Sequence, residues 1–350
     1  MRTVFPFFWQ AQSTVPALEN LSPEQVLQQA DVTGAVGGDP SGGHRLLVTA
    51  LADGKVIGDL QLVATSDDVV IGDMQSVFGR DMVKNHHALR RRRFRLPKYR
   101  SGTALLLGAS NSDNYYHWLI DSLPRWRMLQ AAGWKDFDFV LLHSRSCAFQ
   151  DETLDWLGVP ATRRLHCSKN FVHQFERLVV PAMPFARKTV PAWVAPWLRS
   201  LVPPTSAGAE KIFLSRRGAP GRQVTNEAEL QLALEARGFV TLQPEKYCVL
   251  EQAQRLAGAR WIVAPHGAAL ANMVFAPPGA RVIEFFHPRH KNRCYENLAA
   301  ASGHRYASLD GQANESAEAS RLQYSVDIPA VIAALEETSE ARRPAPAISG

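Results

Sequence analysis

Hydrophobic and polar positions divide the chain into stretches of different character. Before residue 100, short Val, Leu and Ile runs are cut by Asp-Gly and Asp-Asp pairs, as in HRLLVTALADGKVIGDLQLVATSDDVV. This spacing is typical of antiparallel hairpins. From residue 103 onward, runs such as TALLLG, FDFVLLH and FERLVVPA alternate with segments of helical period. Strands that alternate with helices predict a parallel sheet covered on both faces.

A Pro-, Ser- and Gly-rich segment at 200–210, SLVPPTSAGAE, predicts a linker. After it, helices separate the predicted strands KIFLS, FVTLQ, RWIVAP and ARVIEFF. The first of these helices is expected to begin with an N-cap and N3 pair, Asn226 and Glu229, and to end at Gly238. The repeated unit predicts a doubly wound α/β domain, followed by one last helix in PAVIAALEETSEARR.

The chain has 350 residues, more than a single hydrophobic core usually includes, so we expect two domains. The predicted N-terminal domain covers 1–203, with a β-rich, variable part at 1–100 and an α/β part at 101–203. A second α/β domain is expected at 204–328, and a C-terminal helix with a frayed tail at 329–350. Ligands of such folds bind at the carboxyl ends of the strands, and with two halves we expect them in the cleft between.

Composition favours a globular protein without a membrane span. Hydrophobic residues make up 46% of the chain and charged residues 21%. No apolar run approaches the roughly 18–20 residues of a spanning helix, and the opening MRTVFPFFWQ is too short and too aromatic for a signal peptide. The four cysteines are scattered, without a Cys-x-x-Cys pair. We therefore expect reduced thiols in a cytoplasmic protein, and neither a disulfide framework nor a zinc site.

The net charge is +6, and much of the basic excess lies in RRRRFRLPKYR, from Arg90 to Arg100. Such a block can bind nucleic acid, an anionic membrane surface or phosphorylated ligands, or it can be a solvated loop. No recognisable nucleic-acid-binding module surrounds it. We therefore expect no nucleic-acid partner.

The end of the strand RWIVAP carries residue types that suit a phosphate. His266, Gly267, Ala268 and Ala269 follow it and precede a predicted helix. Small residues let a ligand approach the backbone, and the helix N-terminus offers unbonded N–H groups. The alternative is a tight turn whose small residues serve packing only, although packing does not require His266.

Arginines follow another strand of the same half. Arg216 and Arg217 come directly after KIFLS, and Arg222 follows six residues after Arg216. Arg makes bidentate contacts with phosphate, so this group predicts a phosphate clamp, the alternative being a solvated surface loop. Glu284 ends the strand ARVIE, where a carboxylate can accept hydrogen bonds from sugar or ribose hydroxyls.

The stretch HWLIDSLPRW, at 117–126, places His117, Asp121 and Arg125 at steps of four through a run of Trp, Leu and Ile. His117 and Asp121 then lie one turn apart on one helical face. A His bonded to an Asp is a usable general base, because the carboxylate fixes the tautomer and raises the basicity of the ring. The alternatives are a buried polar pair that only orients the helix, and a metal site.

The residues around this stretch set its expected limits. Asp113 or Asn114 is expected to cap the helix, and Pro124 to kink it or to start a second one. A metal site would need more ligands, and the placement of the remaining histidines does not indicate one: His86, His87, His287 and His290. Asp136 and Asp138 spell the Asp-x-Asp of metal-dependent sugar transferases, but they stand at the entry to a hydrophobic strand and are predicted to be structural.

Several reaction classes are poorly supported. The sequence has no Walker-type loop and no Gly-x-Gly-x-x-Gly after a strand, which argues against ATP hydrolysis and nicotinamide chemistry. It has no Gly-x-Ser-x-Gly elbow, which argues against a serine hydrolase.

Three segments together resemble glycosyltransferase family 61: NYYHWLIDSLPRW, FLSRRGAPGRQVTNEAEL and VAPHGAALANMVFAPPGARVIEFF. The resemblance covers roughly residues 100–290, in the same order. The family includes plant xylan and arabinosyl transferases, animal O-linked N-acetylglucosamine transferases and many bacterial capsule or exopolysaccharide proteins. The resemblance implies a GT-B fold, with two Rossmann-like domains facing across a cleft, and an inverting, metal-independent transfer from a nucleotide sugar, usually a UDP-sugar.

The resemblance implies roles on the donor side for residues of the C-terminal half. Arg216 and Arg222 are expected near the diphosphate. The residues from His266 to Ala269 occupy the family's His-Gly-Ala-Gly type loop, with Ala269 where a second Gly is common. Glu284 matches the acidic position that ends the next strand, near the donor ribose or sugar. Without a metal, Arg side chains and a helix N-terminus would have to hold the charge of the leaving diphosphate.

On the acceptor side, His117 and Asp121 match the family's His-Trp-x-x-Asp element. Either is a candidate base, and the resemblance does not settle which of them deprotonates the acceptor. Asn114 and Arg125 are expected beside them, on the acceptor side of the site.

The expected partners are a nucleotide-sugar donor and a glycan or lipid-linked glycan acceptor of cell-surface polysaccharide biosynthesis, with no cofactor and no metal. The expected location is the cytoplasm, with the block from Arg90 to Arg100 as a hypothetical peripheral contact to the anionic inner membrane. The alternative is a non-catalytic subunit of a polysaccharide assembly machinery that binds a nucleotide sugar or a glycan. Turnover with a suitable acceptor distinguishes the two.

Overall fold

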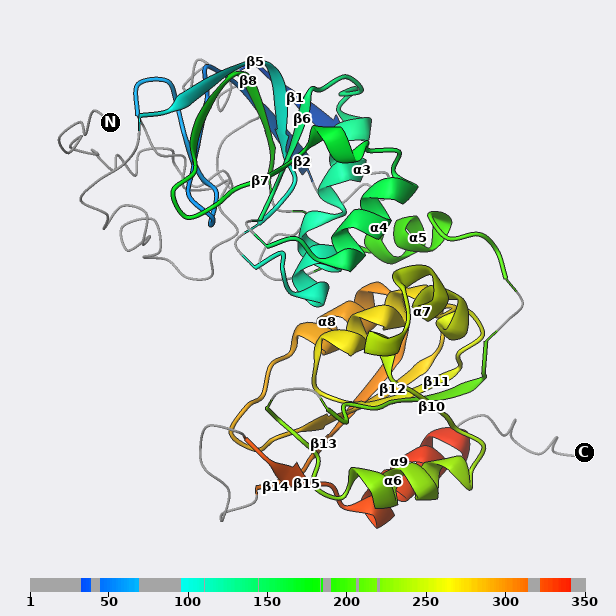
Figure 1. Ribbon diagram of the computed structural model, residues 1–350. Coiled ribbons are helices and arrows are strands. Elements are labelled where there is room, and N and C mark those ends of the chain that lie inside the picture. The colour runs from blue at the N-terminus through cyan, green and yellow to red at the C-terminus, as the bar shows by residue number, and fades with distance from the viewer. Residues whose placement is uncertain are drawn as a thin grey trace, which may run out of the picture. The chain divides into compact units, whose positions relative to one another are not determined.

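The computed structural model describes residues 33–38, 45–68, 96–109, 111–143, 145–182, 184, 190–205, 208–218, 221–313 and 322–340. The chain divides between Leu201 and Val202 into two compact units, which we call unit 1 and unit 2. Figure 1 shows that both combine helices with a sheet. The mixed α/β class expected from the sequence is confirmed, and the division falls two residues before the predicted boundary.

The sheet of unit 1 joins a parallel core to an antiparallel extension. Its strands are β1 (Thr33–Gly38), β2 (Arg45–Ala52), β3 (Lys55–Ile57), β4 (Leu62–Ala64), β5 (Lys98–Leu106), β6 (Phe139–Leu142), β7 (Arg164–His166) and β8 (Val172–Pro181). The order is β1-β2-β8-β5-β6-β7, with β3 beside β8 and β4 beside β3. Strands β8, β5, β6 and β7 run parallel, and the others pair antiparallel. The hairpins and the parallel strands predicted from the sequence are confirmed.

The helices of unit 1 are short: the π-helix η2 (His117–Ser122), α3 (Arg125–Ala131), α4 (Ala148–Trp156), the 3-10 helix η3 (Ala161–Arg163) and α5 (Val194–Ser200). The last three positions of β5 are buried in succession, as expected for a parallel strand covered on both faces. The core of the unit gathers aliphatic side chains of β5, β6 and β8 around Phe171 and Phe175.

Unit 2 has five parallel strands in the order β10-β9-β11-β12-β13. They are β9 (Lys211–Leu214), β10 (Val240–Leu242), β11 (Trp261–Pro265), β12 (Arg281–Phe286) and β13 (Arg305–Asp310). A two-stranded antiparallel sheet, β14 (Gln312–Ala313) and β15 (Tyr324–Ser325), follows them. All six positions of β12 are buried, because helices cover both faces of the central strands.

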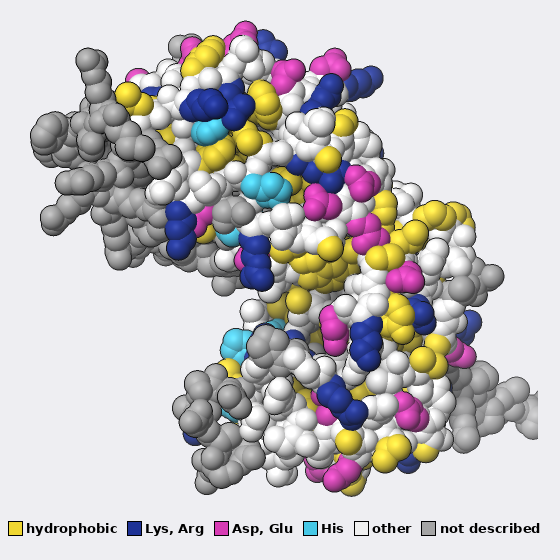
Figure 2. Space-filling view, in the orientation of Figure 1, with side chains coloured by type: hydrophobic (Ala, Val, Ile, Leu, Met, Phe, Trp, Pro, Cys, Tyr) yellow, Lys and Arg dark blue, Asp and Glu magenta, His cyan; other side chains and the backbone are white. Residues whose placement is uncertain are grey.

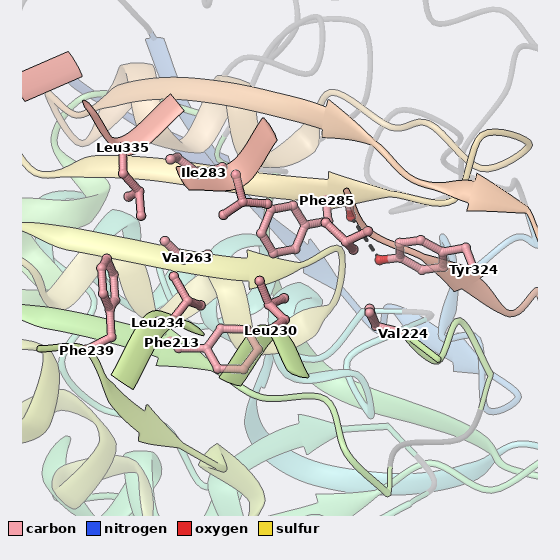
Figure 3. Packing of buried hydrophobic residues seen from close by; sticks show 12 residues of the cluster. Phe213, Val224, Leu230, Leu234, Phe239, Val263, Ile283, Phe285, Tyr324 and Leu335 are labelled. Atoms are coloured by element: carbon pink, nitrogen blue, oxygen red, sulfur yellow. Dashed lines mark hydrogen bonds between the residues drawn. The ribbon is translucent and has the colours of Figure 1, made fainter. Parts of the chain in front are cut away.

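The helices of unit 2 are α6 (Glu227–Glu235), the 3-10 helix η4 (Pro244–Lys246), α7 (Val249–Leu256), the 3-10 helix η5 (Ala268–Phe275), α8 (Cys294–Ala301) and α9 (Ile328–Glu340). In Figure 1, α6 and α9 lie on one face of the sheet, and α7 and α8 on the other. Leu230 and Leu234 of α6 and Leu335 of α9 pack in one cluster with side chains of the sheet (Figure 3). The doubly wound arrangement predicted for this half is confirmed, whereas α8 and β13 were not predicted.

Asn226 stands at the N-cap of α6 as predicted, but the capping role predicted for its side chain is wrong. The Asn226 side chain makes no capping bond. Its amide instead donates to the carbonyl of Val326 at 2.8 Å and accepts from the N–H of Val326 at 2.9 Å. A tertiary partner one hundred residues away has replaced the local one. The predicted end of the helix is confirmed, since Gly238 adopts a φ of 81° and its N–H reaches the carbonyl of Glu235.

The segment after His266 winds as a 3-10 helix over eight residues, longer than such helices usually run. Side chains three positions apart eclipse in this geometry, and small side chains tolerate that best. Ala268 and Ala271 form one such pair. The sequence pattern predicted a helix here but not its type.

Among the described residues, no helix is long and apolar enough to cross a membrane. All four cysteines lie in the described part of the chain, and none forms a disulfide. Of the basic block, positions 90–95 lie outside the described residues, while Lys98 and Tyr99 are exposed at the start of β5. Figure 2 shows basic and acidic side chains interspersed over the visible face.

Candidate functional site

The sheet of unit 2 reverses its winding between β9 and β11. The chain passes from β9 to β10 on one side of β9, and then crosses to β11 on the other side. In open α/β sheets, ligands bind at the carboxyl ends of the two strands that flank such a switch point. Strand β9 ends at Leu214 and β11 at Pro265. Ser215 and Arg216 therefore follow one flanking strand, and His266 and Gly267 the other.

Arg216 reaches across the switch point to Gly267. A Cβ on Gly267 would overlap Nη1 of Arg216. The backbone of Gly267 has φ 171°, which any residue adopts, so glycine is required here for space and not for conformation. Among the described residues, the Arg216 side chain makes one long hydrogen bond, from Nε to the carbonyl of Gly221 at 3.5 Å. Burial, and then the charge of Arg222, lower the pKa of Arg216.

The side chain of Arg222 bonds to His290, a contact that the sequence did not predict. Nη1 of Arg222 donates to Nε2 of His290 at 3.0 Å, which requires Nε2 to be unprotonated. Burial lowers the pKa of His290, followed by the charges of Arg222, His266 and His287. The ring of His290 lies edge-on to that of His266, with centroids 5.4 Å apart. Two arginines and two histidines therefore converge beside the switch point.

Glu227 anchors the loop that carries Arg216. Its carboxylate is 5% exposed, and it accepts hydrogen bonds from the Ser215 hydroxyl and, at 3.0 Å, from the Arg216 N–H. Our sequence analysis missed this residue. The available signal was a second acidic residue in the first turn of α6, two positions before Glu229.

The carboxylate of Glu284 faces the interior. It is 0% exposed, and its Oε1 lies 2.5 Å from Nδ1 of His266. Its Oε2 accepts a hydrogen bond of 2.5 Å from the hydroxyl of Tyr306. With Nδ1 of His266 bound to this carboxylate, Nε2 is the ring nitrogen left for a ligand. The contact between Glu284 and a donor sugar stays a prediction, because both oxygens are engaged inside the unit.

Ala268 and Ala269 open η5 directly after Gly267. Among the described residues, Asn272 in the same helix is fully buried, and its amide donates to Gln252 on α7 and to the carbonyl of Ala269. These contacts fix the start of η5 against α7. The backbone that would face an anion is therefore held in place from behind.

In unit 1, His117 and Asp121 form the predicted pair. Nδ1 of His117 lies 2.6 Å from Oδ2 of Asp121. The His117 side chain is 23% exposed and that of Asp121 only 6%, so the carboxylate lies behind the ring and the ring faces outward. Burial raises the pKa of Asp121, opposed by its hydrogen bond to His117 and by the charge of Arg125. The carboxylate thus fixes the side of the His117 ring that carries Nδ1, as expected for a His–Asp pair.

The pair stands on a π-helix, where the N–H of Leu123 bonds to the carbonyl of Trp118 at 2.8 Å. Helices of this kind are rare and often occur at functional sites. Asn114 caps the segment, since its Oδ1 accepts from the N–H of Tyr116 at 3.0 Å. Pro124 stands at the N-cap of a second helix, α3. Of the two predicted alternatives, a kink or a new helix, the second is therefore confirmed.

Arg125, which we expected on the acceptor side, lies in the interior of unit 1, and its acceptor-side role stays a prediction. Arg125 is 1% exposed, and its guanidinium donates to the carbonyls of Gly108 at 2.8 Å and Ala182 at 3.4 Å. Gly108 follows β5 and Ala182 follows β8. These two strands flank the switch point of unit 1, because the chain runs from β5 to β6 and β7 and then returns to β8 on the other side of β5. A side chain of the protein thus fills the position where such folds bind ligands.

No group of three or more His, Cys, Asp or Glu side chains within the described ranges is placed to hold a metal ion. Asp138 is structural as predicted, since its carboxylate accepts the N–H of Thr103 at 2.8 Å.

A cavity of about 830 Å³ lies at the opposite, amino end of the strands in unit 2, beside Lys211, Trp261 and Arg281. It is distant from the switch point in the fold. The switch point is the stronger candidate because its arginines and Gly267 make a site suited to an anion.

Comparison with known proteins finds one family model that covers many of these elements. The family model described as Glycosyltransferase 61 matches residues 115–283, just under half of the chain. The match includes the His117–Asp121 pair, Arg216 and the loop from His266 onward, and it ends one residue before Glu284.

Curated relatives match a shorter part. The EGF domain-specific O-linked N-acetylglucosamine transferase of Drosophila melanogaster is 36% identical over 101 residues, 28% of this chain and 19% of that protein. The protein O-linked-mannose beta-1,4-N-acetylglucosaminyltransferase 2 of Canis lupus familiaris is 34% identical over 115 residues, 27% of this chain and 20% of that protein. The chain thus spans about a fifth of the length of these relatives. The segment that matches the Glycosyltransferase 61 model, residues 115–283, thus contains both the His117–Asp121 pair and the Arg216–Gly267 switch point.

Proposed function

We propose that this chain transfers a sugar from a nucleotide sugar to a glycan or lipid-linked glycan acceptor. The observation that carries the proposal is the Arg216 guanidinium at the switch point, against Gly267 and with one long hydrogen bond among the described residues. A guanidinium in this state has N–H donors to offer a phosphate. Arg222 and His266 stand beside it, so the cluster can hold the charge that develops on a leaving diphosphate.

His117 is the proposed general base, with Asp121 behind it. The carboxylate holds the Nδ1 proton and stabilises the imidazolium that forms when Nε2 takes the proton of an acceptor hydroxyl. The oxygen of that hydroxyl then attacks the anomeric carbon while the bond to the diphosphate breaks. A single displacement of this kind inverts the anomeric configuration.

The finer assignments follow from the family resemblance. We propose UDP as the nucleotide, transfer without a metal, a GT-B fold formed by the two units and a role in cell-surface polysaccharide synthesis. The relatives named above are N-acetylglucosamine transferases, which makes UDP-N-acetylglucosamine the first donor to assay. A peripheral contact with an anionic membrane remains part of the proposal.

Calorimetric titration with UDP, in EDTA, tests the donor site. We expect micromolar binding that Arg216→Ala weakens by about tenfold or more, because a hydrogen bond between charged groups is lost. The matched control is Arg217→Ala, since Arg217 is the exposed neighbour on the same loop. No UDP binding, binding only after a divalent cation is restored, or equal losses in both variants would contradict the proposed site.

Turnover tests the catalytic half separately. With UDP-N-acetylglucosamine and a panel of sugar acceptors, Asp121→Asn should lower kcat by about 100-fold or more and leave UDP binding unchanged. The asparagine keeps the volume but removes the charge that stabilises the imidazolium. Donor binding without turnover on any acceptor would favour the non-catalytic subunit instead.

A further inference from the structure

Tyr306, on β13, completes a chain of hydrogen bonds that ends at His266. Its hydroxyl donates to Oε2 of Glu284 at 2.5 Å, and Oε1 of Glu284 meets Nδ1 of His266 at 2.5 Å. Tyr306 lies outside the region that the family model matches. These hydrogen bonds connect three strands, because His266 follows β11, Glu284 is in β12 and Tyr306 is in β13.

The sheet itself sets up this chain. Glu284 pairs in register with Ser308, and Val282 pairs with Tyr306, so Tyr306 is the diagonal neighbour of Glu284 on the adjacent strand. A long side chain bridges such a diagonal. A carboxylate at 0% exposure is costly unless donors satisfy its oxygens, and here Tyr306 and His266 each satisfy one.

The hydrogen bonds from Tyr306 through Glu284 hold the His266 ring in one orientation. Its Nδ1 is bound to Glu284, and its ring is stacked on Phe286, with centroids 5.1 Å apart and planes 28° apart. Tyr295 lies edge-on to the same ring, with centroids 5.2 Å apart. The ring therefore cannot exchange its two nitrogens without breaking the bond to a fully buried carboxylate.

We infer that Tyr306 is a positioning residue, which acts through Glu284 to fix His266 so that Nε2 faces the donor diphosphate. The inference rests on the proposed function in one respect, because that function identifies the ligand as a diphosphate. The orientation and tautomer of His266 do not depend on that function, because they follow from hydrogen bonds within the protein.

The test compares Tyr306→Phe with Tyr324→Phe, each of which removes one hydroxyl from a largely buried ring of unit 2. The Tyr324 hydroxyl donates to the backbone carbonyl of Phe285 at 3.2 Å, as the dashed line in Figure 3 marks, and not to the Glu284 carboxylate. The first readout is the ¹⁵N chemical shifts of the two His266 ring nitrogens without ligand, assigned with His266→Gln. The second is the Kd for UDP, measured by calorimetry.

We expect wild type and Tyr324→Phe to show a single tautomer, protonated at Nδ1, and Tyr306→Phe to show shifts averaged between tautomers. Binding of UDP should weaken by about tenfold in Tyr306→Phe and change by less than about twofold in Tyr324→Phe. Glu284→Gln alters the link between Tyr306 and His266, and it should reproduce the change in the ¹⁵N shifts of the ring nitrogens. It replaces Tyr306→Phe as the test variant if that variant folds poorly.

Unchanged ring shifts in both Tyr306→Phe and Glu284→Gln would overturn the inference. Altered shifts with unchanged UDP affinity would also overturn it, since the orientation of His266 would then not matter to the ligand. A wild-type protein that does not bind UDP would refute the proposed function instead, and the shifts would still show whether Tyr306 positions the ring.

Discussion

The guanidinium of Arg216 occupies the space beside the Cα of Gly267 that a side chain at position 267 would fill. An arginine also stands at the switch point of unit 1, where Arg125 bonds to the carbonyls of Gly108 and Ala182. The two arginines differ in how many of their N–H donors are already bonded within the protein. Arg125 is 1% exposed and engaged with the backbone, whereas Arg216 is partly exposed with one long bond among described partners. Unit 2 is therefore the unit whose switch point can take an anion.

Gly267→Ala should displace the Arg216 guanidinium while leaving the backbone unstrained. We expect UDP affinity to fall by about 10- to 100-fold, as when a charge-assisted hydrogen bond is lost, with little change in melting temperature. Ala269→Gly is the matched control, because it alters the same turn by removing a methyl group and should retain binding. Calorimetry and thermal denaturation measure both effects. Wild-type affinity in Gly267→Ala would show that Arg216 has no part in binding.

Glu227→Ala should destabilise the loop after β9. The Ser215 hydroxyl and the Arg216 N–H would each lose a buried acceptor, so the free energy of unfolding should fall by about 2–3 kcal/mol. Glu229→Ala, at an exposed position in the same turn, should cost under about 1 kcal/mol, through the helix dipole alone. Urea denaturation measures the difference, and equal losses in the two variants would refute the anchoring role of Glu227.

Arg125→Met should unfold unit 1 more readily without touching the donor site. Methionine fills much of the volume but leaves the carbonyls of Gly108 and Ala182 without their donor, and the loss should be about 3 kcal/mol. Arg127→Met, two positions along α3 and partly exposed, is the control. Denaturation followed by tryptophan fluorescence reports the loss. An Arg125→Met variant as stable as wild type but unable to use an acceptor would support the acceptor-side role instead.

His173 predicts an acid-dependent loss of stability. Burial, and then the charges of Arg100 and Lys98, lower its pKa to about 4, and Nε of Arg100 donates to its Nδ1 at 2.8 Å. The unfolded chain binds this proton near the ordinary value of about 6.5, so the stability is complete above that pH and is lost as pH falls toward 4. His173→Gln keeps an acceptor for Arg100 and should flatten this part of the profile. Identical slopes of unfolding free energy against pH in wild type and variant would contradict the assignment.

The sequence was informative where local pattern and chemistry agree. Buried runs such as RWIVAP and ARVIEFF gave the strands, and the i, i+4 spacing gave the contact between His117 and Asp121. It failed where a distant partner decides the outcome. Asn is a residue type that often caps helices, but the Asn226 side chain bonds to Val326. Arg is usually a surface residue, but Arg125 is buried in unit 1.

The sequence by itself determined the α/β class, the alternation of strands and helices from residue 103 onward, and the residue types suited to phosphate, because periodicity and side-chain chemistry are local properties. Only the tertiary structure decided that Arg216 meets Gly267, that Glu227 holds the Arg216 loop, and that Tyr306 reaches His266 through Glu284. The contacts of Arg216 and Tyr306 depend on which strands are neighbours in the sheet, and the Glu227 contact depends on how α6 packs against the end of β9. Strand order is fixed by the burial of the whole unit, which no short segment of sequence encodes.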